Sequence, residues 1–281
     1  MKNPYESIPT RILEVIEETP TIRTFRLGPE KPVSFESGQF VELTVPGVGE
    51  APFTPSSSPF DDKLEMTIMK VGRVTSALFD LKAGATLGIR GPYGKRYPLE
   101  KFKGKDILIC GGGVGLAPLR SLFLALLHQR ERYGRLFLRY GARTPADIVY
   151  KYLLPVGPQE NPGQSTDWSR LTDVDVDLSV DRGDASWTGK VGVVTVLLQE
   201  IPCDVKSSVA VVCGPPLMMK FTTMRLVEAG FPDESIYLSM EKNMSCGLGQ
   251  CGHCRLGIYF TCKDGPVLTW AQVKGEEEPF A

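Results

Sequence analysis

Four of the seven cysteines lie in one glycine-rich stretch, "MSCGLGQCGHCRLGIYFTC", which spans residues 244–262. Thiolates are soft ligands that bind zinc or iron–sulfur clusters, and a C-x-x-C pair can also act as a thiol redox couple. The glycines between the cysteines suit a loop that points several N–H groups at sulfur atoms. The stretch therefore predicts a metal or redox site. Its candidate ligands are Cys246, Cys251, Cys254 and Cys262.

The spacing of these cysteines favours a cluster over zinc. The first three form C-x4-C-x2-C, the spacing of plant-type [2Fe-2S] ferredoxins. Zinc ribbons usually carry two C-x2-C knuckles, and this stretch has one. A thiol pair of Cys251 and Cys254 would leave two cysteines unexplained. We predict a [2Fe-2S] cluster held by all four thiolates, with zinc as the alternative.

A second glycine-rich motif, "ILICGGGVGLAPLRSL", follows an apolar strand and opens a helix. Glycines let the backbone approach a pyrophosphate, whose charge is favoured at a helix N-terminus. A proline near the start of the helix fits this geometry. The motif therefore predicts a dinucleotide site. Its residues are Gly111, Gly112, Gly113, Gly115, Ala117 and Pro118.

The elements that must position these motifs fall into two kinds. In the first hundred residues, apolar positions alternate between Gly and Pro turns, which predicts an antiparallel β-barrel. The expected strands are 10–18, 21–28, 38–47, 64–72 and 85–94.

From residue 105 onward, strands alternate with helices. "KDILICGGGVGLAPLRSLFLALLHQRERYG", "RLFLRYGARTPADIVYKYLL" and "SSVAVVCGPPLMMKFTTMRLVEAG" each predict a strand, a turn and a helix, and so a parallel sheet. We expect a loop and then a strand over 156–190. The predicted fold is a β-barrel domain (1–102), an α/β parallel-sheet domain (103–240) and a C-terminal iron–sulfur segment (241–281).

The bulk properties exclude several classes. A chain of 281 residues fits two domains, and a net charge of -1 offers no basic surface for nucleic acid. The N-terminus is charged and polar, and no run approaches the ~20 apolar residues of a membrane span. We therefore expect a cytoplasmic protein.

The order of these motifs resembles the ferredoxin reductase superfamily of flavoproteins. A barrel, the sequence "GPYG" at 91–94 and an α/β domain that opens with "CGGGVGLAPLR" carry the resemblance. It implies FAD on the barrel and NAD(P) on the α/β domain. The family's flavin motif, Arg-x-Tyr-Ser or Arg-x-Tyr-Thr, falls on Ala51, Pro52, Phe53 and Thr54. Ala51 replaces the arginine that helps to neutralise the diphosphate, and Arg73 is a candidate substitute.

The resemblance also implies roles for further residues. It places Cys213 beside the nicotinamide, with Phe53 and Thr54 on the flavin side, as the residues nearest to hydride transfer. Arg143 could meet the adenosine ribose, and the coenzyme is left as NAD(P). The remaining FAD residues are Gly72, Arg73, Thr75 and Ser76, and the remaining NAD(P) residues are Gly214, Pro215 and Pro216.

A reductase core followed by "LSMEKNMSCGLGQCGHCRLG" looks like the gamma subunit of cytosolic NiFe hydrogenases. It also resembles the corresponding subunit of anaerobic sulfite reductase and the electron-transfer subunit of dihydroorotate dehydrogenase. The resemblance implies an NAD(P)H-linked oxidoreductase subunit that passes electrons through FAD and the cluster to partner subunits. The alternative from another class is an assembly subunit without flavin and with a structural zinc, which the alanine at 51 favours.

Overall fold

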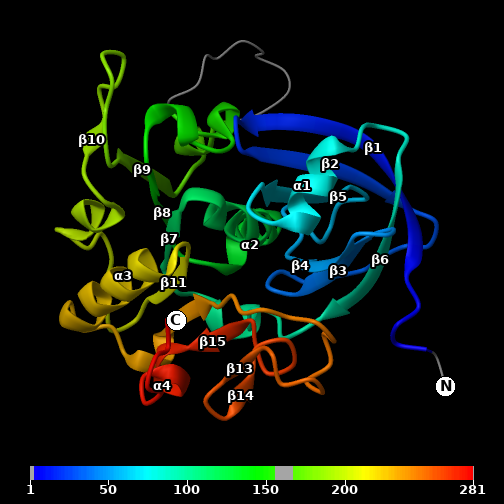
Figure 1. The fold of residues 1–281 in the computed structure, drawn as a ribbon. Coiled ribbons are helices and arrows are strands. Elements are labelled where there is room, and N and C mark those ends of the chain that lie inside the picture. Colours follow the sequence, from blue (N-terminus) through cyan, green and yellow to red (C-terminus); the bar gives the residue numbers. More distant parts are fainter. Residues whose placement is uncertain (1–2, 156–166, 281) are drawn as a thin grey trace. The chain divides into compact units, whose positions relative to one another are not determined.

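The computed structural model describes residues 3–155 and 167–280 (Figure 1). Residue contacts divide the chain into two compact units. Unit 1 comprises Met1–Tyr97, Ala117–His128 and Ser239–Leu268, and unit 2 comprises Pro98–Leu116, Gln129–Leu238 and Thr269–Ala281. The cysteine segment therefore groups with the N-terminal strands. The domain boundaries expected from the sequence stay a prediction, and the first part of the expected loop, 156–166, lies outside the described residues.

Unit 1 is built on an antiparallel sheet in the order β4-β3-β6-β1-β2-β5, which confirms the expected barrel-type fold. Figure 1 shows its strands curving around helix α1. Their alternate apolar side chains form one buried core that includes Ile12, Phe25 and Met66. The elements are β1 (Ile8–Thr19), β2 (Ile22–Pro29), β3 (Phe40–Val45), β4 (Gly49–Phe53), β5 (Leu64–Met69), α1 (Arg73–Asp80) and β6 (Thr86–Tyr93).

Two of these elements were not expected, because the sequence of both stretches is typical of turns. Strand β4 lies at the edge of the sheet, and an edge strand tolerates a proline such as Pro52 because a nitrogen without a hydrogen can face the open side. Helix α1 follows the N-cap residue Gly72, whose N–H donates to Thr75 Oγ1 at 2.8 Å. Polar turn-like residues here therefore form an edge strand and a short helix.

Unit 2 contains a parallel sheet in which β10, β9, β8, β7, β11 and β12 are neighbours in that order. Every residue of β7, β8 and β11 is buried, as expected for strands covered on both faces. The elements between residues 107 and 239 are β7 (Ile107–Gly112), α2 (Leu116–His128), β8 (Leu136–Ala142), β9 (Val174–Val180), β10 (Lys190–Val191), β11 (Val209–Cys213), α3 (Pro216–Glu228) and β12 (Ile236–Ser239). Of these, α2 belongs to unit 1 from Ala117 onward.

The strand order reverses between β7 and β11, because the chain runs outward from β7 through β8 and β9 and then returns to β11 on the other side. In open parallel sheets, ligands bind outside the carboxyl ends of the strands at such a switch point. The glycine motif follows β7 and the Cys-Gly-Pro motif follows β11. The topology therefore brings the two predicted nucleotide motifs together.

The prediction of a helix after β8 was wrong. In the described stretch up to residue 155, only short 3-10 turns follow this strand, at Pro145–Asp147 and Lys151–Leu153. Tyr150, between them, has a left-handed φ of 56°, which a continuing α-helix does not allow. The other 3-10 turns are Leu99–Phe102, Gly113–Gly115, Arg130–Arg132, Trp168–Arg170, Val194–Leu198 and Asp233–Ser235.

The C-terminal part of the chain has little regular structure. Its elements are β13 (Arg255–Leu256), β14 (Tyr259–Phe260), β15 (Val267–Thr269) and α4 (Trp270–Val273). Strands β13 and β14 pair as a short antiparallel hairpin between the third and fourth cysteines. Among the described residues, no helix is both long and apolar enough to span a membrane.

Candidate cofactor sites

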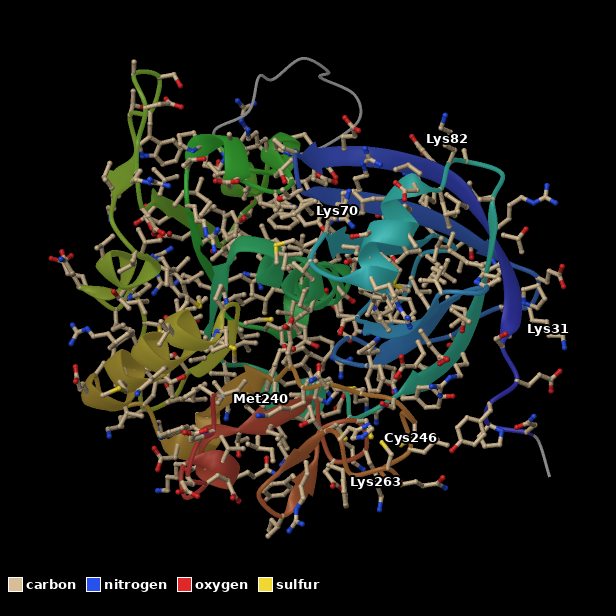
Figure 2. All side chains as sticks on the ribbon, in the orientation of Figure 1. Lys31, Lys70, Lys82, Met240, Cys246 and Lys263 are labelled. Atoms are coloured by element: carbon tan, nitrogen blue, oxygen red, sulfur yellow. The ribbon has the colours of Figure 1, made fainter. Side chains whose placement is uncertain are left out.

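The four cysteines lie in one loop and hairpin of unit 1. Cys246, Cys254 and Cys262 are buried in a small cluster with Phe40, whereas Cys251 is exposed. Figure 2 shows Cys246 in this segment. The fold thus brings residues up to sixteen positions apart into one site with one cysteine at the surface.

Backbone N–H groups point at the cysteine sulfurs. The N–H groups of Leu248 and Gln250 donate to Cys246 Sγ, each at 3.3 Å, and that of Gly249 donates to Cys262 Sγ at 3.0 Å. Gly249 has a φ of +73°, in the left-handed region that suits glycine. Such donors stabilise negative charge on sulfur, so the loop fits thiolates that hold a cluster.

Hydrogen bonds and burial together give two of these thiols very different pKa values. Burial opposes ionisation of Cys246, but N–H donors from Cys251, Leu248 and Gln250 outweigh it and lower the pKa of this thiol to about 6. Burial and a hydrogen bond with Cys254 raise the pKa of Cys262 to about 12. Cys246 is therefore the more readily ionised of these two thiols before any metal binds.

The cysteines of the described residues are not gathered into a preformed metal-ion site. Within residues 3–155 and 167–280, no group of three or more His, Cys, Asp or Glu side chains is gathered closely enough to hold one metal ion. A structural zinc would need four sulfurs about 2.3 Å from one centre. The described geometry therefore offers no preformed zinc site.

Arg90 on β6 joins the cysteine loop to the barrel. Its Nη1 donates to the carbonyl of Cys246 at 2.8 Å, and its Nη2 donates to the carbonyl of Ser245 at 3.0 Å. Gly247, with a φ of +73°, packs on the same surface, where an added Cβ would lie 3.0 Å from the Tyr93 ring. The loop is therefore fitted closely to β6.

Two carboxyl groups accompany Arg90. Its Nε donates to both carboxylate oxygens of Glu50, one of them at 2.8 Å, and its Nη2 lies 3.9 Å from Glu42 Oε1. Glu42 is 1% exposed, and its carboxyl oxygens accept no hydrogen bond from any residue that the structure describes. Burial raises the pKa of Glu42 to about 8, against the opposing field of Arg90 and with a further contribution from Glu50.

The predicted flavin motif lies on and just beyond the edge strand β4. Ala51 and Pro52 pair across to Leu43 and Glu42 of β3. Arg73, in the first turn of α1, reaches the same strand, because a Cβ added at Gly49 would lie 3.4 Å from Arg73 Nη2. A guanidinium group therefore lies near the strand that lacks the family's arginine.

The other predicted flavin residues differ in their burial and in their hydrogen bonds. Phe53 is half-buried and packs against the barrel core. Thr54 and Ser76 are also half-buried. The Thr75 hydroxyl accepts from Val71 N–H at 2.9 Å and donates to the carbonyl of Gly72, so it holds the start of α1.

The two nucleotide motifs of unit 2 are in direct contact. Gly111 and Cys213 are Cα partners on neighbouring strands. A Cβ added at Gly115 would lie 2.6 Å from the carbonyl oxygen of Cys213 and 2.7 Å from Gly214 Cα, so only glycine fits there. A Cβ at Gly113 would meet nothing within 4 Å, which leaves open space beside a backbone with φ +55°. These glycines fit a loop that a pyrophosphate approaches.

The other predicted nucleotide residues lie on or next to the elements named below. Cys213 is 2% exposed at the end of β11, and Pro216 begins α3. Pro118 lies in the first turn of α2, after Ala117. Arg143 is exposed just after β8, and its carbonyl accepts from the N–H of Arg182, which is also exposed. Arg182 is thus a second cation at the carboxyl ends of neighbouring strands.

Sequence reasoning missed Arg90, Glu42, Glu50 and Arg182. Arg90 and Glu42 carried a usable signal, because each is a charged residue within an otherwise apolar strand, and such residues are rarely buried without a role. The pairing of Arg90 with a loop 155 positions away had no signal in the sequence.

Three protein-family models match the chain. An oxidoreductase FAD-binding domain matches residues 10–97, an oxidoreductase NAD-binding domain matches 108–224, and the iron–sulfur cluster binding domain of dihydroorotate dehydrogenase B matches 241–274. The structure and these matches define an NAD(P)-linked oxidoreductase that carries electrons between a nicotinamide, FAD and an iron–sulfur cluster.

Relatives match over nearly the whole chain. Sulfhydrogenase 1 subunit gamma of Pyrococcus furiosus is 36% identical, over 96% of this chain and 93% of the relative. A probable dihydroorotate dehydrogenase B (NAD(+)) electron transfer subunit of Methanocella arvoryzae is 36% identical, over 93% and 90%. The structure of an NADH-dependent reduced ferredoxin-NADP oxidoreductase has a TM-score of 0.74 and 25% identity, over 94% and 89%. The chain belongs to the family of electron-transfer subunits that includes these two relatives.

Proposed function

We propose that this chain is the NAD(P)H-linked electron-transfer subunit of a heteromeric complex whose catalytic subunit is a hydrogenase. The observation that carries the proposal is the 36% identity with a sulfhydrogenase gamma subunit over 96% of the chain. A second gamma subunit, of sulfhydrogenase 2, is equally similar over 95%. The cytoplasmic location expected from the sequence stays a prediction.

The residues that would hold the cofactors are those predicted from the sequence. A [2Fe-2S] cluster is the proposed cluster type, since the C-x4-C-x2-C spacing is that of such clusters and the loop donates N–H groups to the sulfurs. Its ligands are Cys246, Cys251, Cys254 and Cys262. FAD would contact Pro52, Phe53, Thr54, Gly72, Arg73, Thr75 and Ser76. NAD(P) would contact Gly111, Gly112, Gly113, Gly115, Ala117, Pro118, Arg143, Cys213, Gly214, Pro215 and Pro216.

The bound groups supply the redox chemistry, since a flavin can accept a hydride's two electrons and release them singly to a cluster. The protein supplies binding and electrostatics. Arg73 offers positive charge to the FAD diphosphate, and the glycines after β7 leave room for the pyrophosphate of NAD(P). Cys213, Phe53 and Thr54 are the proposed residues beside the reacting rings.

The partner would dock where the cluster is nearest to the surface. Cys251 is exposed, and Ile258, at the tip of the β13–β14 hairpin, is 77% exposed. Single electrons then leave through this face. No described constellation of nucleophile, base and orienting group offers a site for a terminal substrate, so the final reduction belongs to the partner.

A second function has its own support. The model that matches 241–274 describes the iron–sulfur domain of dihydroorotate dehydrogenase B, and a relative of that name is also 36% identical. In that case the partner oxidises dihydroorotate. The equivalent subunit of anaerobic sulfite reductase fits the same cofactors.

Isolation of the native complex distinguishes these partners. The chain carries an affinity tag in its own host, and the complex is purified without air and assayed with hydrogen, dihydroorotate and sulfite in turn. We expect hydrogen-dependent reduction of NAD(P)+, lost when Cys251 is replaced by serine. NAD(P)-linked turnover of dihydroorotate or sulfite without hydrogenase activity would refute the hydrogenase proposal. A single chain that alone turned over any of the three would refute the need for a partner.

A further inference from the structure

Arg90 is buried between the barrel and the cysteine loop. Its side chain is 4% exposed, and its guanidinium carbon lies 5.4 Å from the centroid of the Tyr93 ring and 5.7 Å from that of Tyr5. All three guanidinium nitrogens donate hydrogen bonds, to Glu50, to Tyr93 and to the carbonyls of the cysteine loop. Arginine stays protonated in proteins, so this is a permanent positive charge in a fixed place.

The hydrogen bonds from Arg90 to the cysteine loop lie at the start of that loop. They involve the carbonyls of Ser245 and Cys246, the residue before the first cysteine and that cysteine itself. An added Cβ at Gly247 would lie 3.3 Å from Arg90 Nη1, so the chain passes close to the guanidinium group. The charge therefore lies against the backbone of a proposed cluster ligand.

A fixed positive charge affects an iron–sulfur cluster in a known direction. Reduction adds one negative charge to the cluster, and a nearby cation stabilises that charge. Glu50 opposes this effect, because its carboxylate is paired with Arg90. The two side chains should therefore shift the reduction potential in opposite directions.

We propose that Arg90 is the positioning residue for the iron–sulfur segment and that the Arg90–Glu50 pair sets the reduction potential of its cluster. Arg90 holds the first ligand against β6 and raises the potential, and Glu50 lowers it. This inference rests on the proposed cluster at the four cysteines. It adds to that site two barrel residues that bind no iron.

The test is a redox titration of the cluster in the complete, cofactor-loaded protein. The variants are Arg90→Met, Arg90→Lys, Glu50→Gln and the double variant Arg90→Met with Glu50→Gln. Cluster reduction is followed by its visible and electron paramagnetic resonance spectra, and iron and sulfide contents are measured for each. The titrations are run at pH 6, where the raised pKa of Glu42 keeps that carboxyl group neutral.

We expect Glu50→Gln to favour the reduced cluster and Arg90→Met to disfavour it, each by roughly tenfold, which is about 59 mV for one electron. The double variant should return close to the wild-type potential. Arg90→Lys should leave the potential close to that of wild type but lose iron faster, because a compact ammonium group lacks the planar fork with which Arg90 reaches both carbonyls and Glu50. Glu36→Gln, on an exposed ion pair with Arg96, is the control and should change neither property.

The possible outcomes distinguish a failure of the proposed cluster from a failure of this inference. Wild-type protein without iron–sulfur spectra would refute the proposed cluster. A wild-type cluster whose potential is unchanged in Glu50→Gln, or moves the same way as in Arg90→Met, would overturn the inference alone. Glu50→Gln keeps both bonds from Arg90 to the loop, so it decides the electrostatic claim even if Arg90→Met fails to fold.

Discussion

Glu42 is a carboxyl group with almost no access to water. It lies on β3 opposite both Pro52 of β4 and Arg90 of β6, so it stands between the predicted flavin strand and the strand that holds the cysteine loop. Desolvation dominates its ionisation and raises its pKa from 4.5 to about 8, although Arg90 opposes the shift. The folded protein therefore keeps this group protonated at pH values where the unfolded chain has lost the proton.

This difference predicts a pH-dependent stability. Because the folded pKa is the higher one, the contribution of Glu42 is fully present below about pH 4.5 and is lost as the pH rises to about 8. A Glu42→Gln variant has no carboxyl group to ionise at this position, so it does not lose this stability as the pH rises. Its stability relative to wild type should rise by roughly 1.4 kcal/mol per pH unit across that window.

Thermal unfolding of the loaded protein at pH 5, 7 and 9 measures the effect. The melting temperature of Glu42→Gln should gain on that of wild type at each step. Glu36→Gln, which removes an exposed carboxylate, should follow wild type. Parallel curves for Glu42→Gln and wild type would show that Glu42 ionises normally in the folded state.

A second prediction at the residue scale concerns Arg143 and Arg182. Both are exposed, and a backbone hydrogen bond of 3.0 Å joins them at the carboxyl ends of β8 and β9. If they meet the ribose end of the coenzyme, they favour the 2′-phosphate of NADPH. Replacing both by serine should then lower kcat/KM for NADPH by about tenfold, with little change for NADH.

Steady-state reduction of an artificial electron acceptor by each coenzyme provides the measurement. Arg170→Ser is the control, because Arg170 is an exposed arginine of the same unit that lies away from these strand ends. An unchanged preference in the double variant would place the adenosine ribose elsewhere.

At the scale of elements, helix α1 and strand β4 make the proposed FAD-binding edge. Arg73 in the first turn of α1 reaches Gly49 at the start of β4. Arg73→Gln should therefore weaken FAD binding by about tenfold, because a charge-assisted contact with phosphate is lost. Adding Ala51→Arg, which restores the arginine of the family motif, should recover the affinity.

FAD affinity can be followed by the quenching of flavin fluorescence as FAD is added back to stripped protein. Arg11→Gln removes an exposed arginine from β1 and serves as the control. Equal affinities for Arg73→Gln and wild type would show that another group neutralises the diphosphate.

The elements show which parts of the fold the sequence could predict. Strands β1, β2, β3, β5 and β6 follow the apolar alternation, and β7, β11 and their helices follow the strand–glycine–helix pattern, so these were predicted correctly. Strand β4 contains a proline and no alternation, and α1 is short and polar, so neither had a periodic signal. The helix expected after β8 had a plausible sequence but is interrupted at Tyr150.

The candidate sites also contain parts that the sequence could predict and parts that it could not. Local motifs identified the four cysteines, the glycine loop and the Cys-Gly-Pro turn, because each is contiguous in the sequence. The Arg90 network joins β3, β4, β6 and the cysteine loop, and only the folded chain brings these together. Pairings of this kind depend on strand order and register, which no local pattern contains.

For the whole molecule, the central claim is that one chain links a two-electron donor to a one-electron exit. Three family models cover the flavin, nicotinamide and iron–sulfur parts in that linked chain. The flavin must lie between the other two in the order of transfer, because a cluster cannot accept a hydride. Loss of any one of the three groups should therefore stop electron flow from NAD(P)H to the partner.

One measurement tests this claim most directly: the visible spectrum of the purified chain, kept without air, before and after addition of NADH or NADPH. We predict flavin bands at about 450 nm over broad iron–sulfur absorbance, and both should bleach with at least one coenzyme. In a Cys254→Ser variant only the flavin bands should bleach. A colourless protein that contains zinc, or a cluster that stays oxidised while the flavin is reduced, would contradict the account.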